Sequence, residues 1–135
     1  MSVGYSGTSL IKKLGIKEGM RVAILGAPDG FDDTLGELPD GVGVARRLGG
    51  GKDIVIAFVT ERAVLAQRLE ALRSAIAPDG MIWVAWPKKA SGVATDITED
   101  VVRDVVLPTG LVDVKVCAID TTWSGLKIVI RKELR

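Results

Sequence analysis

Three short runs of the chain are wholly apolar, and each has the length of a buried β-strand. They are residues 22–25, 54–59 and 81–86, within strands that we expect over residues 20–25, 53–59 and 81–86. Strands that are apolar on both faces are typical of a parallel sheet covered by helices on each side. Between the second and third runs, segment 61–77 carries apolar side chains at helical spacing, at Leu65, Leu69, Leu72 and Ile76. This spacing predicts a helix with one buried face packed on the sheet.

Capping residues and turns set the limits of two helices. Thr60 is expected to cap the helix over 61–77, and Pro78-Asp79-Gly80 is expected to end it. Asp96 or Thr98 caps a second helix, because acidic residues follow in its first turn. The buried face of that second helix consists of Val101, Val102, Val105 and Val106.

The N-terminal third carries weaker signals. Thr8 or Ser9 would cap a short helix, and Gly15 would end it in the left-handed conformation that favours glycine. A further short helix is expected over residues 31–38, and a weak strand over residues 42–45. The two short helices are expected to flank the first apolar strand, and the weak strand is expected to pair with it.

From Leu111 onward the hydrophobic pattern has a period of two. Val112, Val114, Val116 and Ala118 alternate with other residues, and so do Leu126, Ile128 and Ile130. Alternation predicts an antiparallel hairpin at one edge of the sheet. The whole chain, residues 1–135, is therefore predicted as one α/β domain. It is a three-layer αβα sandwich with a mostly parallel central sheet and a C-terminal antiparallel β-hairpin, and residues 1–7 are expected to be disordered.

Composition removes several kinds of chemistry. The chain has no histidine and one cysteine, so a structural zinc site and every nucleophile paired with histidine are excluded, and no metal site is expected. Its formal net charge of +1 provides no global field for nucleic acid or an anionic membrane. No apolar run reaches the length of a membrane span, and we expect a cytoplasmic protein. Cys117 lies in a predicted strand, which favours a buried, inert thiol.

The loop over residues 87–96 is the best candidate for a site. It follows the apolar strand 81–86, and ligands of open α/β sheets bind beyond the carboxyl ends of the strands. Its residues are small, polar and cationic, which suits an anionic ligand such as a phosphate or carboxylate. Trp123 would either wall the same pocket or cover the edge of the core. The predicted ligand-binding residues are Lys88, Lys89, Ser91, Gly92, Asp96 and Trp123.

Three stretches resemble S-adenosylmethionine-dependent methyltransferases. Residues 19–30 are similar to that family's first strand and glycine-rich loop, 72–84 to its helix, turn and fifth strand, and 110–132 to its closing hairpin. The resemblance implies a Rossmann-like fold, shortened here because the Gly49–Gly51 connection replaces a strand and a helix. It also implies cofactor-binding positions at Gly26, Asp29 and Gly30.

The chain departs from the methyltransferase pattern at the cofactor loop. Pro28 stands at the middle glycine of that loop, where it adds a ring and removes an N–H donor. The acid expected near the start of the loop corresponds to Ile24. Arg46 and Arg47 stand near the place of the acid that would bind the ribose hydroxyls.

A second resemblance covers nearly the whole chain. Residues 86–96, Trp-Pro-Lys-Lys-Ala-Ser-Gly-Val-Ala-Thr-Asp, and residues 120–127, Asp-Thr-Thr-Trp-Ser-Gly-Leu-Lys, resemble a bacterial family of small uncharacterised proteins. This resemblance implies no particular activity.

Three hypotheses about function follow from these patterns. The first is a binding or interaction module on a methyltransferase-like scaffold, without a working S-adenosylmethionine site, that holds a small anionic molecule at the 87–96 loop. The second is a S-adenosylmethionine-dependent methyltransferase with an atypical cofactor loop. The third is a structural partner protein that forms a homo-oligomer through the exposed edge of the hairpin. Catalytic residues are not predicted, because no candidate has an assured partner.

Overall fold

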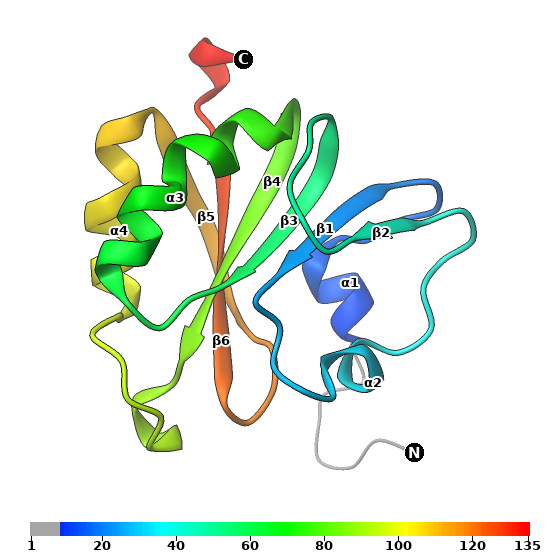
Figure 1. The fold of residues 1–135 in the computed structure, drawn as a ribbon. Coiled ribbons are helices and arrows are strands. Elements are labelled where there is room, and N and C mark those ends of the chain that lie inside the picture. Colours follow the sequence, from blue (N-terminus) through cyan, green and yellow to red (C-terminus); the bar gives the residue numbers. More distant parts are fainter. Residues whose placement is uncertain (1–8) are drawn as a thin grey trace.

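A computed structural model describes residues 9–135, so the expectation for residues 1–7 lies outside the described part of the chain. Six strands form one sheet in the order β2-β1-β3-β4-β6-β5 (Figure 1). The first four in that order are parallel, whereas β6 runs antiparallel to both of its neighbours. The strands are β1 (Arg21–Leu25), β2 (Gly43–Ala45), β3 (Lys52–Phe58), β4 (Ile76–Pro87), β5 (Leu111–Ala118) and β6 (Trp123–Ile130).

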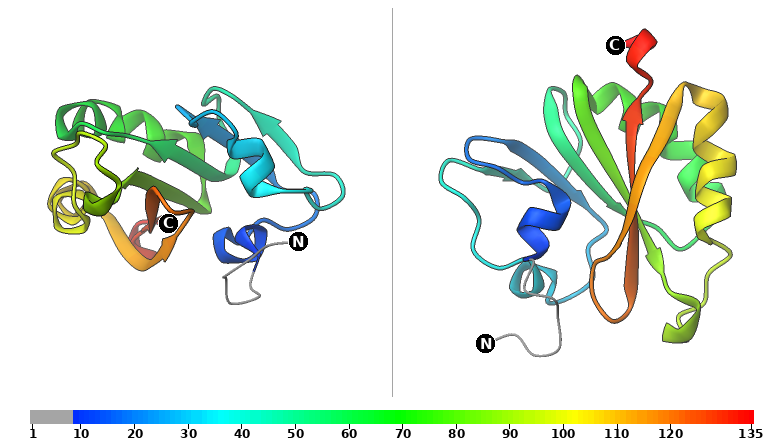
Figure 2. Two further views of the ribbon diagram at one scale, coloured as in Figure 1. Left: turned by 90° about the horizontal axis from the view of Figure 1, so that it is seen from below. Right: turned by 180° about the vertical axis from the view of Figure 1, so that it is seen from behind.

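Helices lie on both faces of this sheet (Figure 2). On one face are α3 (Arg62–Ala75) and α4 (Glu99–Val106), and on the other are α1 (Leu10–Leu14) and α2 (Phe31–Leu35). Short 3-10 turns follow β4, α4 and β6, at Lys89–Ser91, Leu107–Thr109 and Lys132–Leu134. The arrangement confirms the predicted αβα sandwich with its antiparallel C-terminal hairpin.

Strand β4 separates two hydrophobic cores. Ile82 and Val84 face the core under α3 and α4, whereas Trp83 and Ala85 face the core under α1 and α2. All four side chains are fully buried, as the apolar run of this strand predicts. The indole Nε1 of Trp83 donates a hydrogen bond to the backbone oxygen of Leu14. This bond anchors the short helix α1 to the middle of the sheet.

The predicted capping residues of α1 and α4 are confirmed. The Ser9 side chain accepts a hydrogen bond from the Lys12 amide, and Gly15 ends α1 at a φ of 81°. Thr98 caps α4 by accepting from the Val101 amide. Both caps satisfy amide groups that have no partner within the helix.

Two expectations around α3 are wrong. The N-cap of α3 is Glu61, not Thr60, and the carboxylate of Asp96 accepts a hydrogen bond from the first helical amide, that of Arg62. The cap therefore comes from a loop far along the chain, which local sequence cannot reveal. Pro78-Asp79-Gly80 also belongs to β4, with a register shift against the start of β3, and is not a separate turn. Gly80 fits there because a Cβ would lie about 3.0 Å from the backbone oxygens of Ala77 and Lys52.

The hairpin forms the edge of the sheet, but its pattern is less regular than the sequence predicts. The register of β5 against β6 shifts between Asp113 and Lys115. Strand β5 forms hydrogen bonds with β6 only, because it lies at the edge of the sheet. Val114 and Val116 are consequently exposed, at 51% and 48%. Among residues 9–135 we find no helix with the length and apolar character needed to cross a membrane.

Candidate functional site

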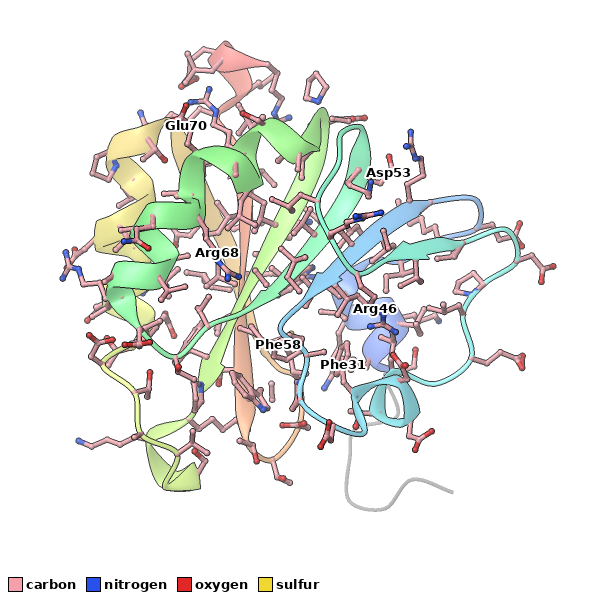
Figure 3. The ribbon with its side chains drawn as sticks, in the orientation of Figure 1. Phe31, Arg46, Asp53, Phe58, Arg68 and Glu70 are labelled. Atoms are coloured by element: carbon pink, nitrogen blue, oxygen red, sulfur yellow. The ribbon has the colours of Figure 1, made fainter. Side chains whose placement is uncertain are left out.

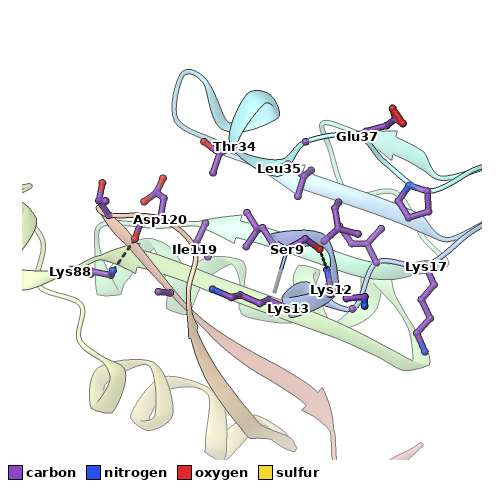
Figure 4. A pocket seen from close by; sticks show the side chains of 18 residues that line it. Ser9, Lys12, Lys13, Lys17, Thr34, Leu35, Glu37, Lys88, Ile119 and Asp120 are labelled. Carbon is purple, nitrogen blue, oxygen red and sulfur yellow. Dashed lines mark hydrogen bonds between the residues drawn. The ribbon is translucent and has the colours of Figure 1, made fainter. Parts of the chain in front are cut away.

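A large hollow of the described chain lies between α1, α2 and the turn that joins β5 to β6 (Figure 4). Its volume is about 1070 Å³, slightly above the usual range of about 300–1,000 Å³ for small-molecule sites. Apolar side chains form much of its wall: Leu10, Ile11, Ile16, Leu35 and Ile119. Charged side chains also line it: Lys12, Lys13, Lys17, Lys88, Glu37 and Asp120. The cavity therefore combines an apolar interior with an excess of cations.

The β5–β6 turn forms one wall and is held by its own hydrogen bonds. The Asp120 carboxylate accepts from the amides of Thr122 and Trp123, at 2.8 and 2.7 Å. The Ile119 amide donates to the backbone oxygen of Trp123 at 2.9 Å. These bonds use the carboxylate of Asp120 inside the turn and direct the buried side chain of Ile119 to the core.

Lys88 joins the end of β4 to this turn. Its amide donates to the backbone oxygen of Thr122 at 2.7 Å, and its Nζ donates to the backbone oxygen of Asp120 at 2.8 Å. An ammonium group has three hydrogens, so two remain for another acceptor. The side chain is partly buried at the cavity wall, and its ammonium is held in place before any ligand arrives.

The other residues of the 87–96 loop lie away from the cavity. The structure describes that whole loop, and among its residues Lys88 alone lines the hollow. Lys89 is exposed, whereas the Ser91 hydroxyl donates to the backbone oxygen of Lys88 at 2.6 Å and accepts from the Val93 amide at 3.2 Å. Gly92 ends the 3-10 turn at a φ of 77°. The fold thus separates two lysines that are adjacent in sequence.

Asp96, the last predicted residue of the loop, packs against the start of α3. Its Oδ1 lies 2.7 Å from the Arg62 amide. Beside it, the Thr95 hydroxyl donates to the backbone oxygen of Thr60 at 2.6 Å and accepts from the Ile97 amide at 3.0 Å. Asp96 therefore stabilises a helix terminus on the face of the sheet that carries α3 and α4.

Trp123 belongs to a row of three aromatic side chains across the carboxyl ends of β1 and β3. Its ring meets the edge of Phe58 at a centroid distance of 5.1 Å, and Phe58 meets Phe31 at 4.9 Å. Phe31 and Phe58 lie close together in Figure 3 and are both buried. Trp123 is half-buried and packs against the core under α1 and α2.

The glycine-rich loop after β1 packs tightly on β3. Gly26 has a φ of 68°, and a Cβ there would lie 3.0 Å from the backbone oxygen of Phe58. Gly30 precedes α2 at a φ of 82°, and Asp29 is exposed. A smaller polar hollow of about 450 Å³ lies beside this loop. The guanidinium of Arg46 crosses to Asp32 there, with its Nη2 2.8 and 3.0 Å from the two carboxylate oxygens.

Three features of these residues differ from the nucleoside site that the methyltransferase resemblance implies. The residue that follows β2 is Arg46, a cation, where a carboxylate would accept hydrogen bonds from the ribose hydroxyls. Of the three carboxylates that line this hollow, those of Asp29, Asp32 and Asp33, the Asp32 carboxylate is paired with Arg46. Pro28 lines the hollow without an N–H group to donate.

Lysines of the sheet extend the basic character beyond the cavity. Burial, together with the ammonium groups of Lys115 and Lys17, lowers the pKa of Lys127. Burial raises the pKa of the Cys117 thiol, while Lys13 and Lys115 act in the opposite direction. Residues from α1, β5 and β6 therefore share one electrostatic environment on the α1 side of the sheet.

The sequence did not point to the lysines of α1 as part of a site. The sequence pattern places Lys12 and Lys13 in the last turn of a helix, where cations are favourable, and the structure confirms that position. About 75 residues separate them from Lys88 along the printed chain. Only the fold, through the bond between Trp83 and Leu14, brings α1 to the same cavity.

Comparison with known proteins gives structural matches only. No family model matches the chain, and no curated protein matches its sequence. A SAM-dependent methyltransferase from Aquifex aeolicus superposes with a TM-score of 0.65 at 17% identity, over 90% of this chain and 88% of that one. A putative type 11 methyltransferase from Sulfolobus solfataricus gives 0.64 at 11%, over 91% and 90%. The DhpI–SAH complex gives 0.60 at 12%, over 92% and 83%.

Identities this low establish the fold and leave the activity open. The resemblance to a small bacterial family stays a prediction, since no family model matches. On its strand order, helix layers and structural neighbours, the chain has the Rossmann-like fold of the S-adenosylmethionine-dependent methyltransferases.

Proposed function

We propose that the chain is a cytoplasmic binding module on a methyltransferase-like scaffold, and that it holds a small anionic ligand through Lys88. The observation that carries the proposal is the position of the Lys88 ammonium. It is fixed at the wall of the cavity between α1, α2 and the β5–β6 turn by one hydrogen bond to Asp120, with two hydrogens left to donate. A cation that is already held in place loses little freedom when a ligand binds.

The cofactor loop supports a function without S-adenosylmethionine. Arg46 has the wrong charge for the ribose hydroxyls and forms an ion pair with Asp32. Pro28 removes an amide from the loop, and the Phe31 side chain that follows is buried against Phe58. A nucleoside at this place would have to do without the usual carboxylate.

A pair of adjacent lysines provides the test of anion binding. Lys88→Gln removes the fixed charge, and Lys89→Gln removes an equal charge one residue away and outside the cavity. Calorimetry with inorganic phosphate, citrate and glycerol 3-phosphate should detect binding to the wild type. We expect Lys88→Gln to weaken binding by about fivefold or more, and Lys89→Gln by less than about twofold. Equal effects of the two substitutions would contradict the proposal.

Methyl transfer with an atypical loop is the second candidate, and one observation favours it. The backbone at Gly26 approaches β3 so closely that only glycine fits, and a hollow of about 450 Å³ adjoins it. Thermal unfolding with increasing S-adenosylmethionine or S-adenosylhomocysteine separates the two candidates, because a ligand that binds the folded state raises its stability with concentration. A rise in Tm that continues with the logarithm of the ligand concentration would favour this second function over the first.

A further inference from the structure

The main cavity has two kinds of surface, and a simple anion would use only one of them. Leu35, Ile16 and Ile119 line it but are themselves buried in the core. The half-buried side chains of Leu10, Ile11 and Pro39 expose apolar surface to the cavity. Inorganic phosphate or a short carboxylate needs none of this area. Apolar surface of this extent in a cavity is typical of sites that bury the carbon skeleton of a ligand.

Two cations lie at the same end of the cavity. The side chains of Lys13 and Lys88 both extend toward the Ile119 end, from α1 and from the end of β4 (Figure 4). The Nζ of Lys88 is bonded to the backbone of Asp120, and the ammonium of Lys13 acts on the pKa of Cys117, two residues before Ile119. The strand end from Cys117 to Asp120 therefore has one lysine near each of its ends.

The carboxylates that line the cavity do not neutralise this pair. The Asp120 carboxylate is used by the amides of Thr122 and Trp123, and the group that meets Lys88 is the backbone oxygen of Asp120. Glu37 lies on the other side of the cavity, well away from Lys88 in Figure 4. The charge of the Asp120 carboxylate remains at this end of the cavity, but the two cations Lys13 and Lys88 outnumber it, so a negative group between them is favoured.

We propose that the cavity between α1, α2 and the β5–β6 turn binds an amphiphilic anion, with its acidic group between Lys13 and Lys88 and its apolar body against Leu10, Ile11 and Pro39. This inference rests on the proposed function because it shares Lys88, and it adds a ligand class and a second cation. Carboxylates and phosphates that carry an aliphatic or aromatic body belong to this class. The cavity volume of about 1070 Å³ accommodates a chain of eight carbons.

A series of carboxylates of increasing length tests the apolar part. Isothermal calorimetry with acetate, butyrate and octanoate should show affinity rising with length, by about threefold to fourfold for each CH₂ group that becomes buried. Octan-1-ol has the same chain as octanoate without the charge, and we expect it to bind at least about tenfold more weakly. One octanoate should bind per chain.

Single substitutions test the cationic part with the same probe. Lys13→Gln and Lys88→Gln should each weaken octanoate binding by about fivefold or more, whereas the exposed Lys89→Gln should change it by less than about twofold. These substitutions leave the main-chain hydrogen bonds of residues 13 and 88 in place. Thermal unfolding of each variant verifies that it folds.

The outcomes separate this inference from the proposed function. If phosphate binds through Lys88 and octanoate binds no better than acetate, the amphiphile is excluded and anion binding at Lys88 remains. If octanoate binding depends on length but on neither lysine, the inference is overturned, and the phosphate titrations of Lys88→Gln and Lys89→Gln decide the proposed function separately. Loss of binding in Lys88→Gln with no effect of Lys13→Gln removes the second cation from the inference. Absence of octanoate binding at millimolar concentration overturns the inference.

Discussion

The indole nitrogen of Trp83 lies 3.0 Å from the backbone oxygen of Leu14 and donates a hydrogen bond to it. Both residues are fully buried, and this bond joins the central strand β4 to the C-terminal turn of α1. Helix α1 has five residues, too few to be stable alone. Its position, and with it one wall of the main cavity, depends on Trp83.

Trp83→Phe should therefore affect both stability and the cavity. The change leaves the Leu14 oxygen without its donor and removes part of a fully buried ring, which together should cost about 2–4 kcal/mol of unfolding free energy. Urea denaturation measures this loss, and calorimetry with octanoate measures the cavity. Trp86→Phe is the control, because Trp86 packs in the opposite core, under α3 and α4. Equal effects of both variants on octanoate binding would contradict the anchoring role of Trp83.

Asp96 is expected to stabilise α3 as a long-range N-cap. Asp96→Ala removes the acceptor of the Arg62 amide and should lower the unfolding free energy by about 0.5–2 kcal/mol. Asp79→Ala removes an equally charged, exposed side chain from β4 and should change stability by less than about 0.5 kcal/mol. Chemical denaturation of the two variants measures the difference. A loss of anion binding in Asp96→Ala, at full stability, would instead assign this residue to a ligand site.

Stability at acid pH should depend on Asp113. A hydrogen bond from the Arg103 guanidinium lowers the pKa of the Asp113 carboxyl, against the opposing effect of burial. A carboxyl whose pKa is lower in the folded state stabilises the fold above its unfolded value, near 3.9, and loses this contribution as the pH falls through its folded value. The free energy of unfolding should therefore decrease as the pH is lowered below about 4.

Asp113→Asn should flatten that acid limb, and unfolding in urea at several pH values measures it. Asp100→Asn is the matched control, since Asp100 also pairs with Arg103 but its side chain is 92% exposed. An exposed pair contributes little, so this control should keep most of the pH dependence of the wild type. Identical acid limbs for Asp113→Asn and the wild type would contradict the prediction.

Local patterns were sufficient to predict most elements of the fold. The apolar runs that contain Val55 and Val84 became central strands, and Ser9 and Thr98 cap the helices they precede, because each of these features depends on nearby residues. Asp96 was expected in a ligand loop or as the cap of α4, yet it bonds the start of α3, 34 positions away along the chain. Such a contact depends on the tertiary fold and leaves no local pattern.

The sequence could predict the part of the candidate site that contains Lys88, but not the part that contains Lys13. Lys88 follows an obvious buried strand, so its place at the carboxyl edge of the sheet could be inferred. Its neighbour Lys89 has the same local pattern, and the difference between them arises from the bond that Lys88 makes to the β5–β6 turn. Lys13 joins the cavity only because Trp83 holds α1 against β4.

Strand β6 completes the sheet between β4 and β5, although it follows both of them in the chain. During synthesis, the ribosome releases β5 while the strand that will bond to it is still being made. Until β6 arrives, β4 has a free edge, and the apolar core lacks Leu126, Ile128 and Ile130. A nascent chain with an open edge of this kind is vulnerable to association with other chains until β6 pairs with β4 and removes that edge.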